Sequence, residues 1–203
     1  MLFFLYNNFG DNMEWLKYLR YIQYNSFVVL TYFFICLGVM MIHQVTGGES
    51  TKHFFSTSSS SSLLNPITYI RFFTHIFGHG SWEHFTHNFL QILLIGPMVE
   101  EKYGSYNLII MILITALVDA IINKLFCRNT RTYGASGVVF MLIVLSSFVN
   151  LEIGKIPLTL VLIVLFYLID EIFKGIFKRN DGVSHLGHLL GGICGVVFGF
   201  YFK

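Results

Sequence analysis

The sequence predicts an all-α membrane protein with six membrane-spanning helices, and three observations lead to this fold class. Hydrophobic residues make up 55% of the 203 residues, charged residues only 12%, and the mean hydropathy is +0.66. A soluble domain usually carries about 25% charged residues, which cover its surface. Six stretches are almost free of Asp, Glu, Lys and Arg, and they leave too little sequence for a separate soluble domain.

A membrane-spanning helix needs about 20 consecutive, mostly apolar residues. The fifth stretch is the shortest, and the acidic Asp170 and Glu171 border it. We expect an N-terminal segment over residues 1–25 and one six-helix domain over residues 26–203. The six predicted spans contain or cover residues 27–42, 84–99, 105–124, 132–151, 156–169 and 182–202.

The longest connection runs from Thr46 to about Phe73. It contains a serine-rich run, residues 56–62, whose low complexity predicts flexibility. The apolar residues that follow, 63–77, are too few to cross a bilayer. We therefore expect this first loop to lie partly in the membrane interface.

Charge and cysteine content exclude several classes of protein. A net charge of +2 is too small to indicate a nucleic-acid partner. Cys36, Cys127 and Cys194 lie far apart with no CxxC pair, so they are interpreted as buried apolar side chains, with neither a disulfide nor a zinc site. No basic residue precedes the first apolar residues, so no cleaved signal peptide is expected. Neither a metal nor a cofactor is expected.

Three groups of polar or small residues fall within or beside these apolar stretches, where polar side chains are costly. Each alone has a structural explanation: small residues permit close helix packing, as do Gly187, Gly191 and Gly195 at every fourth position, and histidines near helix ends often serve structural hydrogen bonds. Together, a serine, a histidine and a His/Asn pair at the ends of three spans could perform acyl transfer. The three groups are His75, His79, His84, His87 and Asn88, then Gly134 to Gly137 with Ser136, and finally His185 with His188.

From about Tyr69 to Phe202 the chain resembles the rhomboid family of intramembrane serine proteases. The resemblance rests on motifs that occur in the family's order, and the combination is more specific than any one of them. They are Arg71, the HxxxN pattern of His84 and Asn88, Glu100 and Gly104, the GxSG pattern of Gly134, Ser136 and Gly137, and an HxxGxxxG pattern that ends with Gly191 and Gly195.

The resemblance implies a Ser–His dyad that cleaves peptide bonds. Ser136 would be the nucleophile and a histidine of the last span its general base. The side chains of His84 and Asn88, with the Ser136 backbone N–H, would stabilise the oxyanion, and one such donor is typically worth about 3 kcal/mol of barrier. The i, i+4 spacing puts His84 and Asn88 on one helix face. No carboxylate is placed to complete a triad.

Two histidines of the last span are candidates for the base. His188 has glycines at positions +3 and +7, which matches HxxGxxxG, whereas His185 has His188 at +3. The pattern favours His188. His185 is the alternative, and its structural interpretation is a residue just above the dyad.

The sequence departs from the family pattern in two places. Phe140 stands where a tyrosine is common, so stacking on the base is expected without a hydroxyl, and Ile70 replaces the usual tryptophan before Arg71.

His75 and His79 are spaced i, i+4, as metal ligands on a helix can be, but we expect them to line a water-filled cavity.

Other intramembrane proteases fit the sequence less well. An HExxH metalloprotease motif is absent from the sequence. Asp119 and Asp170 do not form an aspartyl-protease pair, and Asp119 is expected to bond Asn123 or Lys124.

The predicted location is an integral, multi-pass one: a bacterial plasma membrane, with a eukaryotic secretory membrane as the alternative. The termini share one side, which holds five of the 13 basic residues, whereas the other side holds eight. The positive-inside rule therefore opposes the cytoplasmic termini that the resemblance implies. The implied partners are the lipid bilayer and single-pass or polytopic membrane-protein substrates. The alternative is a catalytically weak or inactive rhomboid-like protein that binds client transmembrane helices.

Overall fold

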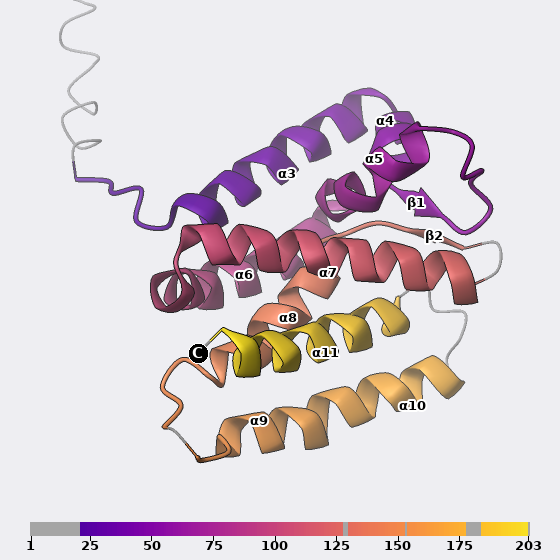
Figure 1. The fold of residues 1–203 in the computed structure, drawn as a ribbon. Helices are drawn as coiled ribbons and strands as arrows, with labels where there is room; N and C mark the ends of the chain where they lie inside the picture. The colour runs from indigo at the N-terminus through magenta and orange to yellow at the C-terminus, as the bar shows by residue number, and fades with distance from the viewer. Residues whose placement is uncertain (1–20, 128–129, 153, 178–183, 203) are drawn as a thin grey trace, which may run out of the picture.

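The computed structural model describes residues 21–127, 130–152, 154–177 and 184–202 (Figure 1). Most of the predicted N-terminal segment and the first two residues of the predicted last span lie outside the described residues. So do six of the basic residues in the charge count: Lys17, Arg20, Arg128, Lys178, Arg179 and Lys203.

Helices account for most of the described chain, which confirms the predicted helical character. A short antiparallel pairing joins β1, Thr57–Ser58, to β2, Arg131–Thr132. The helices are α3 (Phe27–Val45), α4 (Glu49–Phe54), α5 (Ile67–Thr74), η1 (His75–Phe77), α6 (Trp82–Tyr103), α7 (Ser105–Phe126), α8 (Ser136–Ser146), α9 (Leu158–Ile163), η2 (Val164–Leu168), α10 (Ile169–Phe177) and α11 (His185–Tyr201).

Each of the six predicted stretches contains a helix, yet within the described part of the chain only α3 and α7 are long and apolar enough to cross a membrane by length and composition. The helix α6 is long enough, but its first half carries several polar side chains. The helices α8 and α11 are shorter than 18 residues, and the fifth stretch is divided among α9, the π-helical η2 and α10.

The helix α8 lies at the centre of the bundle. It contacts α6, α7 and α11. Its own side chains are apolar on every face, as expected for a helix that is buried among others. In Figure 1, α11 runs between α7 and the α9–α10 segment, while α3 lies across α6 and α7 on the opposite side. The two helices with the GxSG and HxxGxxxG patterns are therefore neighbours.

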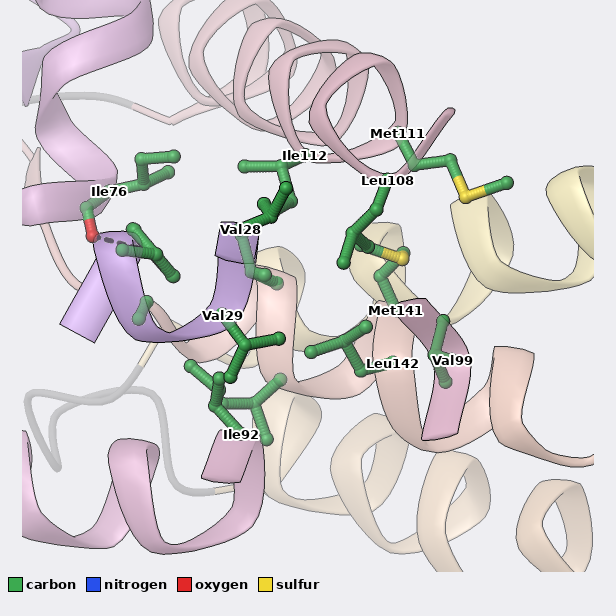
Figure 2. Close-up of a cluster of buried hydrophobic side chains, with 14 of the residues drawn as sticks. Val28, Val29, Ile76, Ile92, Val99, Leu108, Met111, Ile112, Met141 and Leu142 are labelled. Atoms are coloured by element: carbon green, nitrogen blue, oxygen red, sulfur yellow. Dashed lines mark hydrogen bonds between the residues drawn. The ribbon is translucent and has the colours of Figure 1, made fainter. Parts of the chain in front are cut away.

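One hydrophobic core joins α3, α6, α7 and α8 (Figure 2). Val28, Ile92, Leu108 and Met141 each represent one of these helices in the close-up, and Ile76 enters from η1. Burial of such side chains contributes about 1.5–3 kcal/mol each. The core thereby fixes α6, which carries His84 and Asn88, against α8, which carries Ser136.

A stripe of glycines lets the backbones of α8 and α11 approach each other. A Cβ atom on Gly191 would overlap the carbonyl oxygen of Gly137, and one on Gly195 would lie 2.6 Å from the carbonyl oxygen of Met141. A Cβ on Gly199 would enter the ring of Phe148. No side chain can occupy these positions without separating the helices.

The glycine face therefore differs by one turn from the predicted one. Gly187 was predicted to share it, but a Cβ there would lie 2.9 Å from Asp119 Oδ1 on α7. The helix α11 uses Gly187 against α7, Gly191 and Gly195 against α8, and Gly199 against Phe148, which follows α8.

A buried carboxylate holds the start of α3 to the end of α6. Glu100 accepts hydrogen bonds from the Ser26 hydroxyl, from the backbone N–H groups of Val28 (2.9 Å) and Val29 (3.1 Å), and from the Ser105 hydroxyl (2.6 Å). Two of these donors are N-terminal N–H groups of α3, which have no partner within the helix. Glu100 therefore caps a helix 72 positions earlier in the chain.

The first loop is ordered by contacts with other segments. Arg71 Nε donates to the carbonyl oxygen of His53 at 2.7 Å, and the Lys124 ammonium donates to that of Ser61 at 2.5 Å. Strand β1 lies within the serine-rich run and pairs with β2. The prediction of a flexible run was wrong, because the run's backbone and hydroxyl groups find partners elsewhere in the protein.

Candidate active site

Ser136 begins α8, directly after a strained turn at Gly134. Gly134 has φ +121°, a conformation that side-chain-bearing residues rarely adopt, and its N–H donates to the carbonyl oxygen of His75 at 3.0 Å. A Cβ on Gly134 would lie 2.7 Å from Cε1 of His84. The imidazole of His84 therefore packs against the turn that places Ser136, and only glycine leaves room for it.

His84 and Asn88 lie one turn apart near the start of α6. The Ser81 hydroxyl caps this helix by accepting from the His84 backbone N–H at 3.1 Å. Asn88 is buried, and its Nδ2 donates to Nε2 of His79 at 3.2 Å. An amide nitrogen has two hydrogens, so this bond orients the second hydrogen of Asn88. His87, from the same cluster, is exposed.

His79 is held in the neutral form by its surroundings. It lies in the loop before α6, outside the predicted spans, where burial and the neighbouring His84 lower its pKa to about 3, although the carbonyl oxygen of Phe77 opposes this. Its Nδ1 donates to that carbonyl at 3.3 Å. Nε2 is then free of hydrogen and can accept from Asn88.

The lowered pKa predicts a loss of stability in acid. Below about pH 6.5 the unfolded chain binds a proton at His79 that the folded protein refuses until about pH 3. Across this window His79 lowers the free energy of unfolding by up to about 1.4 kcal/mol per pH unit. Denaturant titrations in detergent between pH 4 and pH 7 should show a shallower pH dependence for His79→Gln. Equal slopes for the wild-type protein and His79→Gln would contradict the prediction.

His75 and His79 do not share a helix, because η1 ends at Phe77. The helical i, i+4 spacing noted in the sequence for these two histidines is therefore not present in the structure. His75 is 1% exposed, its Nε2 lies 3.2 Å from Asp119 Oδ2, and Asn123 donates to the other carboxylate oxygen at 2.7 Å. Asp119 thus bonds Asn123, one of its two expected partners, and also ties η1 to α7.

His188 of α11 lies over the first turns of α8. Its imidazole stacks on the ring of Phe140, with centroids 4.3 Å apart and planes at 13°. Phe140 comes one helical turn after Ser136, and Gly137 meets Gly191 at the same crossing. The structure thus brings His188 to the end of α8 that begins with Ser136. His185 lies one turn earlier on α11, with its ring edge-on to that of His188 at 6.2 Å.

A carboxylate also lies beside the two histidines of α11. Glu171 Oε2 is 2.6 Å from Nδ1 of His185 and 3.1 Å from Nδ1 of His188. The sequence predicted no carboxylate beside the base, whereas the structure places Glu171 Oε2 3.1 Å from His188 Nδ1. That expectation treated Glu171 as the border of a span, whereas the helix continues through α10 to Phe177. The apolar residues at 172, 173, 176 and 177 were the signal that the helix goes on.

Within the described residues, Glu171, His185 and His188 are also the group whose ligand atoms could surround a metal ion, since these atoms all lie within 4.8 Å of one another. The distance of 2.6 Å between Glu171 and His185 is that of a direct hydrogen bond. Cys36 and Cys194 are buried among apolar residues, as predicted, whereas Cys127 is only partly buried.

Comparison with known proteins places this arrangement in context. Residues 66–203, more than half of the chain, match the model of the Rhomboid domain. The chain is 29% identical over 161 residues to "Rhomboid-like protein 11, chloroplastic" of Arabidopsis thaliana, covering 71% of this chain and 58% of that protein. It is 26% identical over 174 residues to "Rhomboid protease GluP" of Bacillus subtilis, covering 83% of this chain and 34% of that protein.

A second bacterial protein is also similar to the chain. The chain is 29% identical over 108 residues to "Rhomboid protease GlpG" of Klebsiella pneumoniae, covering 53% of this chain and 38% of that protein. The chain therefore spans between 34% and 58% of the length of these three curated relatives.

Proposed function

This chain belongs to the rhomboid family, whose members are integral membrane proteins, and from that premise we propose that it is an intramembrane serine endopeptidase with Ser136 as nucleophile and His188 as general base. Among its relatives are bacterial proteins named rhomboid proteases. The observation that carries the proposal is the crossing of α8 and α11, where His188 stacks on Phe140 one turn from Ser136.

The chemistry follows from the positions of these groups. His188 Nε2 takes the hydroxyl proton as Ser136 Oγ attacks the carbonyl carbon of a substrate peptide bond, and the carbonyl electrons move to oxygen. The same proton then goes to the leaving amine, and water releases the acyl group from Ser136 in a second cycle. Phe140 holds the imidazole plane in both cycles, and His188 is preferred over His185 because His188 makes this stacking contact.

The negative charge that develops on the carbonyl oxygen needs donors fixed in advance. His84 packs against the Gly134 turn, and Asn88 is oriented by His79. These two side chains and the Ser136 backbone N–H form the proposed oxyanion hole. Each donor is worth about 3 kcal/mol in the transition state, because it need not reorganise during the reaction.

We also propose that all six predicted spans cross the membrane, with cytoplasmic termini. The exposed surfaces of α3, α7 and the α9–α10 segment carry large apolar side chains, which suits contact with lipid. Substrates are then transmembrane segments of other proteins. Since a helix hides its peptide bonds, small or helix-breaking residues near the cut site are expected.

Labelling with a serine-reactive fluorophosphonate tests this function without a known substrate. The purified protein in detergent should label, and Ser136→Ala should abolish labelling. His188→Ala should slow it at least about 100-fold, as loss of a general base does. The matched control is His185→Ala, which keeps Ser136 and His188 and should still label.

The other outcomes are equally informative. If labelling survives His188→Ala and is lost with His185→Ala, His185 is the base. If folded wild-type protein does not label, the proposed protease function is refuted, and the alternative of a rhomboid-like protein that binds client helices takes its place.

A further inference from the structure

Glu171 is the side chain by which α10 faces α11. Among residues 169–173, the part of α10 with described side chains, Glu171 is buried at 7% exposure, while its four neighbours are exposed. Its Oε2 contacts Nδ1 of both His185 and His188. A buried carboxylate is costly unless polar groups surround it, so these contacts account for its position.

The two contacts differ in geometry. The 2.6 Å contact of Glu171 with His185 is a hydrogen bond. The His188 Nδ1 atom lies 3.1 Å from the same oxygen but has no aligned acceptor among the described residues, although it is buried. A buried imidazole nitrogen without a hydrogen bond is unfavourable. A small rotation of the carboxylate would satisfy it, because the distance already allows a hydrogen bond.

The contact between Glu171 and His188 bears on which ring nitrogen of neutral His188 carries the hydrogen. Once the carboxylate has turned to accept from Nδ1, the hydrogen of neutral His188 resides on Nδ1, and Nε2 keeps the lone pair that a base requires. Stacking on Phe140 fixes the plane of the ring, and a hydrogen bond to the turned carboxylate of Glu171 would fix its rotation within that plane. Two constraints of different kind therefore define the orientation of one imidazole.

We propose that Glu171 is a positioning residue for His188, so that the proposed Ser136–His188 pair works as part of a Glu171–His188–Ser136 series. This inference rests on the proposed protease function. When Ser136 loses its proton, that proton binds His188 Nε2, while the Nδ1 hydrogen stays on His188 and Glu171 stays ionised. The carboxylate then stabilises the imidazolium, as the acid of a Ser–His–Asp triad does.

His185 has a defined part in this arrangement. Because Glu171 Oε2 lies between the two Nδ1 atoms, His185 competes with His188 for the same acceptor. Removing the His185 imidazole leaves the carboxylate to His188 alone. A purely structural link between α10 and α11 would depend on His185, which makes the hydrogen bond, and a positioning role would depend on His188.

The maximal rate of fluorophosphonate labelling tests the inference, measured together with the half-saturating probe concentration and the unfolding temperature. Glu171→Gln keeps the shape of the side chain but not its charge. It should lower the maximal rate about 10- to 100-fold, with little change in half-saturation, and Glu171→Asp should recover part of the rate. His185→Gln should label at the wild-type rate or faster. The control is Asp170→Asn, at the exposed neighbouring carboxylate, which should label like wild type.

Several results would overturn the inference. Folded Glu171→Gln that labels at the wild-type rate would leave Glu171 a structural link only. A folded His185→Gln variant as slow as Glu171→Gln would assign the effect to the His185 bond, and this variant decides the matter if Glu171→Gln does not fold. Labelling that EDTA abolishes and zinc restores would make the trio a metal site. In each case wild-type labelling that is lost in Ser136→Ala shows that Ser136 is an activated nucleophile, so the failure of this inference is distinguished from the failure of the proposed function.

Discussion

Replacing Glu100 with alanine is expected to lower the free energy of unfolding by about 3–5 kcal/mol, because four donors lose their shared acceptor at once. The N–H groups of Val28 and Val29 are buried, so water cannot replace the carboxylate. The free energy of unfolding of Glu100→Gln should fall between those of the wild-type protein and Glu100→Ala. The amide keeps one acceptor oxygen but turns an NH₂ group toward groups that are themselves donors.

Thermal unfolding in detergent, followed by intrinsic fluorescence, measures the effect of Glu100. A loss of this size corresponds to a midpoint about 10 °C lower for a protein of this length. The neighbouring Glu101 is exposed and gives a matched control, since Glu101→Ala should stay within about 0.5 kcal/mol of wild type. Equal midpoints for Glu100→Ala and Glu101→Ala would mean that Glu100 does not cap α3.

Gly191→Ala is expected to separate α8 from α11 and to disable the site. The added Cβ overlaps a backbone carbonyl oxygen, that of Gly137, which cannot turn aside as a side chain could. Overpacking of this kind costs about 1–3 kcal/mol, and a rigid backbone contact favours the upper end. His188 is one turn away, so its displacement from Phe140 should slow fluorophosphonate labelling about 100-fold, as a misplacement of about 1 Å can.

A glycine of another helix supplies the control for Gly191. A Cβ at Gly38 of α3 would meet nothing within 4 Å, so Gly38→Ala should keep full labelling and gain about 1 kcal/mol of helix preference. Both unfolding and labelling are measured for each variant. Wild-type behaviour of Gly191→Ala in both assays would contradict the close crossing of the two helices.

Apolar stretches and short motifs predicted the helices and the main groups of the site, since both depend on residues close together in the chain. The HxxxN spacing predicted that His84 and Asn88 share a face, and the HxxGxxxG pattern selected the histidine that stacks on Phe140. The pairing of His75 with Asp119 was not predictable, because their separation of 44 positions is bridged only by packing.

The position of Glu171 beside the histidines of α11 was not predictable from the sequence. Two adjacent acids after an apolar run were interpreted as the end of a span, a sound inference from average helices. The choice between Asp170 and Glu171 as the buried acid depends on which face of α10 meets α11. Which face of α10 meets α11 depends on how the chain winds through α9, η2 and α10 in succession, and the composition of the sequence does not reveal this winding.

The π-helical turn of η2, between α9 and α10, has a consequence for insertions and deletions. A π-helical turn contains one residue more than the corresponding stretch of α-helix. One residue changes the direction of the following side chains around the helix axis by about 100°. The extra residue therefore sets the directions of the side chains of α10, which follows Leu168, and among them the direction of Glu171. A homologue that lacked a single residue between Val164 and Leu168 could keep every motif unchanged and still turn a different side chain toward its histidines.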